Sequence, residues 1–416
     1  MKVLYLIDQK PDGYPGGIEY HLLDILSLFI KKRLPVHILF PELNSLQLRR
    51  YEDYKIHEVA YEGGRLDDHR LKDPAIETTF NKVLDDIDVD IVHFQSIRTL
   101  PLSLIEVAKR RNKKVLITLH EYYFWCINCI MLSPDFCWFQ TDGDKCYECL
   151  NRNGYKVHKG FVEERRQYID YLFQIVDKVI VPSSYVKDVL LNLYTGLSYN
   201  KCVVIELGID KELLRVERKN TTLRKNGTLH LAFLGNFLHY KGNMIFLQLL
   251  KHYKNSDTVN FSIIGNIFDP SLIPSYKNLN VIGGYTRDNV VRTIHRIDPD
   301  LILLLSNWPE TFSYTLSEAI ASGAPVIATD GGALRERVSK EAVGFLVPIE
   351  DPIPKMIKII EDIRHHPEVI EFLRGRVLEA RKRIKTVDDM TEDIFKLYNS
   401  LDREAIPAFE VKRISN

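Results

Sequence analysis

Short apolar runs alternate with helical segments along almost the whole chain, and this alternation restricts the fold more than any other feature. In the first half the runs are KVLYLI, PVHILF, DIVHF, KVLITL, KVIVP and CVVIEL. In the second half they are LHLAFLG, VNFSIIG, LNVIGG, DLILLL, APVIAT and GFLVP. Such uninterrupted apolar runs indicate parallel strands covered on both faces, so each half is predicted to be a doubly wound α/β domain.

The length of the chain predicts two domains, because 416 residues exceed what one hydrophobic core normally organises. The stretch 208–227 is polar and charged and loses apolar periodicity, so we predict that it is the linker. We expect a first domain at 1–207, a second at 228–380, and C-terminal helices at 381–416 that could pack back across the linker.

The charge balance argues against a nucleic-acid partner. The 56 basic and 56 acidic residues cancel, so no global field would recruit nucleic acid or anionic lipid. The apolar run at the N-terminus ends at Asp8, too early for a signal peptide, and no run is as long as a membrane span. We therefore expect a cytoplasmic protein in which any anion site is local.

The stretch 300–332 is predicted to form a buried strand, a loop, a helix and a second strand. Glu310 lies in the predicted loop and Glu318 in the predicted helix. Ligands bind at this end of parallel strands, and the first helical amides, around Phe312–Thr315, would offer donors to an anion. Two carboxylates beside an anion site suggest a ligand with phosphates and hydroxyls. A lone helical glutamate usually just faces solvent, so this assignment needs support elsewhere.

Two other loops offer that support. Lys241 and Gly242 follow the strand LAFLG, where a lysine beside helix amides suits a diphosphate, although a lone lysine there is often solvated surface. Gly16 and Gly17 follow the first strand and lead into a helix, which suits the approach of a phosphate or a sugar, or forms an ordinary glycine loop. The glycine spacing does not fit the dinucleotide fingerprint, so a nicotinamide enzyme is disfavoured.

His120 ends the strand VLITL and is followed by Glu121. A histidine at the carboxyl end of a strand could donate a hydrogen bond to a sugar hydroxyl or stabilise developing charge, or it could be a structural, hydrogen-bonded histidine. Asp88 and Asp90 instead precede a strand, so we place them at the amino end of the sheet, in solvent.

An insertion at 120–150 carries five of the six cysteines. They are Cys126, Cys129, Cys137, Cys146 and Cys149, and they include two C-x-x-C pairs. Two such pairs can place thiolates around one tetrahedral ion, so a structural zinc is our interpretation, with buried thiols or a redox role as alternatives.

The motifs together resemble those of the retaining GT-B glycosyltransferases with paired glutamates, the group 1 or family 4 type. The matching motifs are GGIE at 16–19, HE at 120–121, KG at 241–242 and ETFSYTLSE at 310–318. The resemblance implies two Rossmann-like domains that face a cleft. The cysteine segment also resembles one in members that build bacterial surface polysaccharides, with matches at Cys126, Cys137, Cys146 and Cys149, which leaves Cys129 as the extra thiol.

The resemblance also implies roles for individual residues. Glu310 would contact the donor sugar, Glu318 the ribose hydroxyls, and Lys241 the diphosphate. His120 would face the transferred sugar. The other donor contacts that it implies are Gly16, Gly17, Phe312, Ser313, Gly265 and the turn from Gly283 to Tyr285, the last two near the base.

One position departs from the family pattern. The family usually has an arginine after the glycine of LAFLG, where this chain has Asn236, which brings no charge. We expect another cation, Arg335 or Arg287, to compensate, or else a slow enzyme or one with an altered choice of donor.

The function implied is retaining transfer from a UDP- or GDP-sugar to a saccharide acceptor, often lipid-linked, in lipopolysaccharide or capsule synthesis, without a catalytic metal. The alternatives are a non-catalytic nucleotide-sugar binding protein and a GT-B epimerase. A lipid-linked acceptor suggests peripheral contact with the inner membrane. Residues 22–32 could touch a membrane surface or form a buried crossover helix, and the pattern favours the second.

Overall fold

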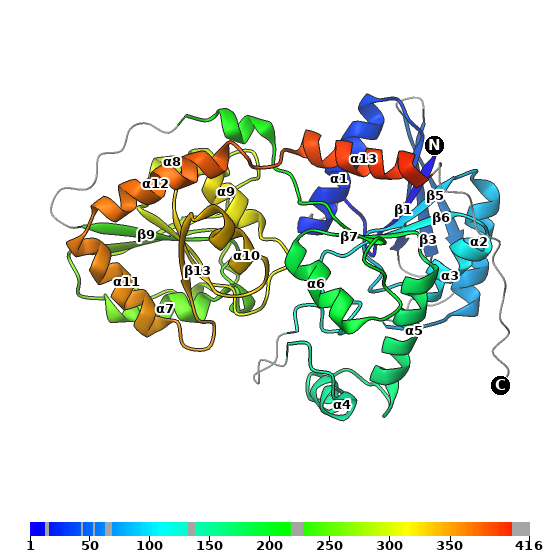
Figure 1. The fold of residues 1–416 in the computed structure, drawn as a ribbon, viewed down its shortest axis with the longest axis horizontal. Helices are drawn as coiled ribbons and strands as arrows, with labels where there is room; N and C mark the ends of the chain where they lie inside the picture. Colours follow the sequence, from blue (N-terminus) through cyan, green and yellow to red (C-terminus); the bar gives the residue numbers. More distant parts are fainter. Residues whose placement is uncertain are drawn as a thin grey trace.

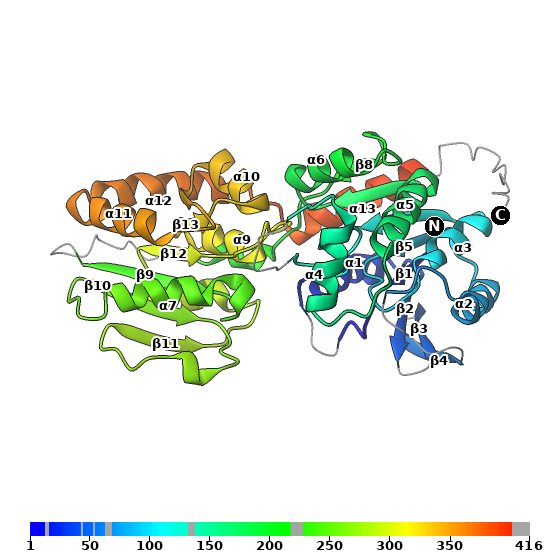
Figure 2. The same ribbon diagram turned by 90° about the horizontal axis from the view of Figure 1, so that it is seen from below.

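The computed structural model describes residues 1–12, 16–42, 45–52, 55–62, 69–131, 138–217 and 228–401. These residues form two α/β domains that lie side by side along the long axis of the molecule (Figure 1). Helices cover both faces of each sheet (Figure 2). The predicted fold class, two doubly wound Rossmann-like domains, is confirmed.

The described part of the first sheet has eight strands in the order β4-β3-β2-β1-β5-β6-β7-β8. These strands are β1 (Val3–Leu6), β2 (Val36–Glu42), β3 (Ser45–Glu52), β4 (Lys55–Glu62), β5 (Ile91–Phe94), β6 (Lys114–Thr118), β7 (Lys178–Val181) and β8 (Cys202–Val204). The helices of this half are α1 (Gly17–Lys31), α2 (Pro74–Asp86), α3 (Ser103–Arg110), α4 (Gly143–Arg152), α5 (Phe161–Ile175) and α6 (Ser184–Leu193).

The antiparallel pair β3 and β4 corrects our expectation of a purely parallel first sheet. Strand β3 pairs antiparallel with β2, and β4 with β3, at the edge of the sheet. In β3 only Leu46 and Leu48 join the apolar core. The sequence lacks the uninterrupted apolar run of a central parallel strand there, so the crossover pattern did not reveal the hairpin.

The second sheet has six described strands, all parallel, in the order β11-β10-β9-β12-β13-β14. These strands are β9 (Leu229–Leu234), β10 (Val259–Ile264), β11 (Leu279–Gly283), β12 (Leu301–Leu304), β13 (Val326–Thr329) and β14 (Gly344–Val347). The helices are α7 (Asn243–His252), α8 (Val290–Ile297), α9 (Tyr314–Ser322), α10 (Gly332–Glu341), α11 (Ile353–His365) and α12 (Glu368–Arg381).

Each sheet has a point where the strand order reverses, and loops diverge there to leave a crevice at the carboxyl ends of the strands. In the first sheet this point lies between β1 and β5, and in the second between β9 and β12. The loops after these strands carry most of the predicted site residues. The fold therefore places the two candidate walls of a ligand site at the two crevices.

The chain crosses between the domains a second time after α12. The last described helix, α13 (Val387–Leu401), lies against α1 in the first domain (Figure 1). The two crossing segments meet in a bridge between Ile209 and Thr386. Met390, Ile394 and Tyr398 are buried in the core that contains α1 and β1. The C-terminal helix is thus part of the first domain's packing.

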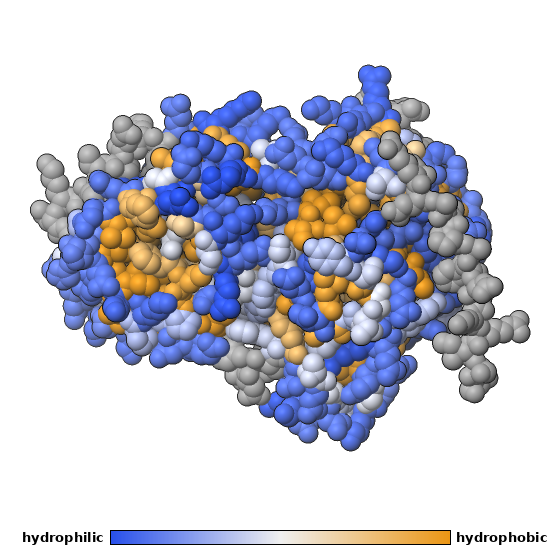
Figure 3. Space-filling model, in the orientation of Figure 1, coloured by the Kyte–Doolittle hydropathy of each residue, from blue (hydrophilic) through white to orange (hydrophobic). Residues whose placement is uncertain are grey.

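Helix α1 is a buried crossover helix. Its apolar side chains Leu22, Ile25, Leu26 and Phe29 are almost fully buried in the core beneath α13. This confirms the interpretation that the pattern of residues 22–32 favoured, a buried crossover helix, because the apolar face is occupied by the protein itself. Within the described ranges no helix has the length and apolarity needed to cross a bilayer. Polar side chains cover much of the face shown in Figure 3, and apolar patches appear over both domains.

Candidate active site

A cavity of about 940 Å³ lies between the two domains. It is lined by the loops after β1, β5 and β6 on one side and by the loops after β9 and β12 on the other. Eight of the predicted site residues line it: Gly16, Gly17, His120, Asn236, Lys241, Glu310, Phe312 and Ser313. Side-chain hydroxyl groups of each domain donate hydrogen bonds to backbone carbonyl oxygens of the other and so join the two walls. Thr311 Oγ1 donates to the His120 carbonyl oxygen at 2.6 Å, and Tyr122 donates to that of Pro309 at 2.8 Å.

Glu310 and Lys241 form an ion pair on the second-domain side of the cavity. The Lys241 Nζ atom lies 2.6 Å from Glu310 Oε1, and Ser306 donates to the same oxygen. Burial alone would raise the pKa of Glu310, but Lys241 and hydrogen bonds from Ser306 and Ser313 outweigh it and lower that pKa, so the carboxylate is ionised. Gly242 allows the two loops to meet, because a Cβ there would lie 1.9 Å from the Leu305 carbonyl oxygen.

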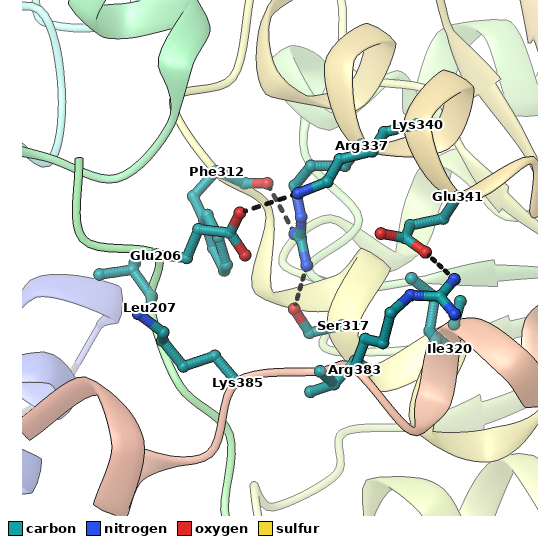
Figure 4. A pocket seen from close by; sticks show the side chains of 12 residues that line it. Glu206, Leu207, Phe312, Ser317, Ile320, Arg337, Lys340, Glu341, Arg383 and Lys385 are labelled. Carbon is teal, nitrogen blue, oxygen red and sulfur yellow. Dashed lines mark hydrogen bonds and ion pairs between the residues drawn. The ribbon is translucent and has the colours of Figure 1, made fainter.

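Ser313 lies beside this pair and is the N-cap residue of helix α9. Ser313 has φ 74°, in the left-handed region that costs energy for a residue other than glycine. Arg337 braces this turn from behind. Its Nη1 atom donates to the carbonyl oxygens of Phe312 and Ser313 at 3.0 and 2.9 Å, and the bond to Phe312 is drawn in Figure 4. Its guanidinium also lies 3.9 Å from the centre of the Phe312 ring. The first N–H groups of a helix have no acceptor within the helix, so those of α9, next to this braced turn, can donate to an anion.

Glu318, Tyr285 and Gly265 lie in the second domain but outside the lining of the central cavity. Tyr285 donates to Glu318 Oε2 at 3.1 Å, so these two predicted residues do meet. Burial raises the pKa of Glu318 to about 7 despite the hydrogen bond from Tyr285. A Cβ on Gly265 would lie 1.8 Å from the Gly235 carbonyl oxygen, so Gly265 lets the loops after β9 and β10 pack together.

His120 lines the cavity from the first domain, and a hydrogen bond to Gln95 determines which ring nitrogen carries its proton. Its Nε2 atom lies 2.8 Å from Gln95 Oε1, and a carbonyl oxygen only accepts, so Nε2 carries the hydrogen. Burial lowers the pKa of His120 to about 3, so the ring is neutral and Nδ1 is an acceptor. Of the alternatives for His120, donation of a hydrogen bond to a sugar hydroxyl is disfavoured, because its single ring proton is already engaged by Gln95.

A buried hydrogen-bond chain continues from His120 to the C-terminal helix. Gln95 Nε2 lies 3.3 Å from His93 Nε2, His93 Nδ1 bonds the Tyr398 hydroxyl, and Tyr398 bonds Tyr5 at 2.7 Å. Because α13 supplies Tyr398, the helix that returns across the linker also helps to fix the ring of His120.

Two family models match the chain in succession: Glycosyltransferase Family 4 over residues 15–213 and Glycosyl transferases group 1 over residues 215–370. The chain belongs to the group 1 glycosyltransferases. Among solved structures, Anabaena Alr3699/HepE in complex with UDP has a TM-score of 0.63 at 16% identity, covering 96% of this chain and 100% of that one. The glycosyltransferase WaaG has a TM-score of 0.59 at 10% identity, covering 95% and 99%. These likenesses identify the fold as GT-B.

Two sequence relatives come from Escherichia coli and Klebsiella pneumoniae. A putative colanic acid biosynthesis glycosyl transferase, WcaC of Escherichia coli strain K12, is 23% identical over 75% of this chain and 76% of its own length. An uncharacterized 41.2 kDa protein in the cps region of Klebsiella pneumoniae is 24% identical over 57% of this chain and 69% of its own length.

The two cations expected to replace the missing arginine of this glycosyltransferase are engaged elsewhere. Arg287 makes a paired contact with Asp24 across the domain boundary, at 2.8 and 2.6 Å. Arg335 donates to Asp330 at 2.6 Å. Neither lines the cavity, and Asn236 itself accepts from Asn266 at 3.2 Å. The expectation about Arg287 and Arg335 is therefore corrected, and Arg337 is a cation that lies beneath the turn at Ser313.

Sequence reasoning did not assign three charged residues that line the cavity. They are Asp8, Arg98 and Glu121, which follow β1, β5 and β6. The same rule that located Glu310, that ligands meet the carboxyl ends of parallel strands, could have found them. Asp8 and Arg98 belong to no motif, and Glu121 was noted only as the second residue of the HE motif, so only the relative placement of three separate loops reveals the group.

The zinc site stays a prediction. Cys137 lies outside the described residues, and in the described ranges no three His, Cys, Asp or Glu side chains converge on a possible metal position. Cys146 and Cys149 lie one turn apart on α4, with Arg166 3.4 Å from the Cys146 sulfur. Cys129 lines the central cavity instead.

We expect the purified protein to carry about one zinc per chain, held by the four matched cysteines. Elemental analysis would measure it. Cys149→Ser should lose the metal and melt at a lower temperature, whereas the matched variant Cys129→Ser should keep it. Zinc-free wild-type protein would rule out the site.

Arg337→Met should weaken the affinity for UDP or GDP by about tenfold or more, because the turn at Ser313 loses its brace and a positive charge. Isothermal titration calorimetry measures the nucleotide affinity, and differential scanning calorimetry measures the thermal stability. The control is Arg335→Met, which removes an exposed cation from the same helix. Unchanged affinity in a folded Arg337→Met protein would show that this arginine only stabilises the fold.

Glu318→Gln should raise stability at pH 8, by an amount on the order of 1–3 kcal/mol. The pKa of Glu318 is raised from its ordinary value of 4.5 to about 7, so folding at pH 8 must bury a carboxylate, a cost absent when the group is protonated. The gain should shrink as the pH falls towards 4.5. Denaturant unfolding at both pH values checks this, and an equal gain at both would refute a buried, titrating carboxyl.

Proposed function

We propose that this glycosyltransferase moves a sugar from a nucleotide diphosphate sugar to a saccharide acceptor, with retention at the anomeric carbon. The observation that carries the proposal is the Lys241–Glu310 ion pair beside the first turn of α9, opposite His120. A lysine and free helix amides suit a diphosphate, and an ionised carboxylate suits the positive charge that develops on the sugar.

The donor is a UDP- or GDP-sugar bound by the second domain. Structural neighbours support this class, because Anabaena HepE is described in complexes with UDP and with UDP-glucose. In our proposal Glu318 receives the ribose hydroxyls, and Tyr285 orients its carboxyl group through their hydrogen bond. Lys241 and the α9 amides neutralise the leaving diphosphate, so turnover should persist in a metal chelator.

The acceptor is a saccharide, in our proposal lipid-linked, and the product belongs to a surface polysaccharide. Support comes from WcaC, named for colanic acid biosynthesis, and from WaaG, described as involved in lipopolysaccharide biosynthesis. A lipid-linked acceptor would bring the enzyme to the membrane surface. The binding surface for that acceptor is the first-domain side of the cavity.

The reaction proposed is a front-face displacement. The bond between the anomeric carbon and the diphosphate oxygen breaks, the acceptor oxygen bonds to the same face, and its proton passes to the leaving phosphate. Glu310 stabilises the cationic sugar. Neutral His120 accepts a hydrogen bond from the transferred sugar through Nδ1, with its ring held by Gln95.

Glu310→Gln should lower transfer by at least about two orders of magnitude, because the amide keeps the shape but cannot balance the cationic sugar. Nucleotide release and the anomeric configuration of the product, read by NMR, measure the reaction. Lys241 is partly exposed and can be rehydrated, so the variant should remain folded. The control Glu371→Gln changes an exposed glutamate on α12. Near wild-type turnover in Glu310→Gln would sink the proposal.

The second candidate is a non-catalytic nucleotide-sugar binding protein, favoured by the uncharged Asn236–Asn266 pair where a cation is usual. Binding of UDP- or GDP-sugars without slow donor hydrolysis would support it. Conversion of the donor without an acceptor into an isomeric sugar would instead indicate an epimerase.

A further inference from the structure

The first-domain wall of the cavity carries three charged side chains that the proposed chemistry at Glu310 does not use. They are Asp8, Arg98 and Glu121, from the loops after β1, β5 and β6. We refer to them as the first-domain cluster. They line the side of the cavity opposite Lys241 and Glu310.

Asp8 has a carboxylate oxygen that lacks a partner. Arg98 Nε donates to Asp8 Oδ2 at 2.5 Å, and Thr99 Oγ1 donates to the Asp8 carbonyl at 3.1 Å, so the loops after β1 and β5 are tied together. The Asp8 side chain is only 2% exposed, and in the described ranges Oδ1 accepts no hydrogen bond. A buried carboxylate oxygen without a donor is unfavourable, and a ligand at this wall could supply one.

Glu121 places a second carboxyl group near enough to the Arg98 guanidinium to act on its charge. It accepts a hydrogen bond from the Tyr123 backbone N–H, and Arg98 and Asp8 are close enough to act on its charge. Burial raises the pKa of Glu121 to about 7, more than Arg98 lowers it. The wall thus carries two carboxyl groups and one guanidinium, an excess of hydrogen-bond acceptors that suits a ligand bringing donors.

We propose that the first-domain cluster binds hydroxyl groups of a neutral acceptor sugar, with Asp8 and Glu121 accepting and Arg98 fixing their spacing. The inference rests on the proposed function and specifies the acceptor. Sugar hydroxyls are hydrogen-bond donors, whereas a phosphate or uronate at this wall would meet two carboxyl groups.

The position of the cluster fits this role. Glu121 follows His120 directly in the chain, so a hydroxyl held by Glu121 lies beside the sugar that faces His120. The opposite wall, with Lys241 and the start of α9, attracts the diphosphate. The two walls therefore sort the substrates by charge: the anionic donor binds the second domain and the neutral acceptor binds the first.

The test uses octyl glycosides of neutral hexoses as acceptor probes, titrated calorimetrically into wild-type protein saturated with UDP or GDP. Asp8→Asn and Glu121→Gln keep the side-chain shapes and remove the charges. Each should weaken glycoside binding by about tenfold or more, while nucleotide affinity changes by less than about twofold. Asp88→Asn is the matched control, because Asp88 pairs with Lys2 at the opposite end of the sheet and should change neither affinity.

Monodeoxy glycosides identify the hydroxyl. Loss of the hydroxyl that meets Glu121 should weaken binding to the wild type but cost nothing further in Glu121→Gln. Unchanged glycoside affinity in both variants, with melting temperatures near that of the wild type, would overturn the inference. So would a wild-type protein that binds nucleotide but only octyl uronides and no neutral glycoside. Failure of the proposed function would give a different result, since the wild type would then neither bind nor hydrolyse a nucleotide sugar.

Discussion

A carboxylate that stays ionised although its side chain is buried is the constraint on which this structure depends. Glu310 has 4% of its side chain exposed, and burial alone would favour the neutral acid. Lys241 keeps it charged, which requires the loops after β9 and β12 to meet. The parallel sheet sets β9 beside β12, and Gly242 lets the backbones approach. The strand order and the glycine at position 242 are therefore both needed to bring Lys241 against Glu310.

The first domain completes the site by enclosing the same loop. Two aromatic residues that flank Glu310 reach into the other domain's cores: Trp308 packs with the cluster around α2 and α3, and Phe312 with the cluster around α1. Thr311 and Pro309, between them, make hydrogen bonds to residues at the end of β6. Moving the domains apart would thus disturb the loop that carries Glu310, so domain closure and the geometry of the charged pair are linked.

The sequence could predict what depends on local pattern. The uninterrupted apolar runs indicated the parallel strands of both sheets, and the ends of those strands located Glu310, Lys241 and His120. The edge hairpin was missed because β3 alternates and carries charges, among them Arg49, which is buried between Asp12 and Glu58. The proton position on His120 could not be foreseen, since it is set by Gln95 from another strand's end. The grouping of Asp8, Arg98 and Glu121 was missed for the same reason, because only the folded sheet brings their three loops together.

The missing arginine at Asn236 shows how charge is distributed across the site. Lys241 already neutralises Glu310, so that pair offers little net charge to a diphosphate until the ligand shares the lysine. The remaining positive potential must come from the start of α9 and from Arg337 behind it, whose charge survives burial although its pKa falls to about 10. A cation behind the turn cannot be reached by the ligand, yet it fixes the carbonyls of Phe312 and Ser313 so that the amides face outward. Anion binding would then depend on preorganised backbone dipoles more than on direct salt bridges, which suits a site that must release its diphosphate after each transfer.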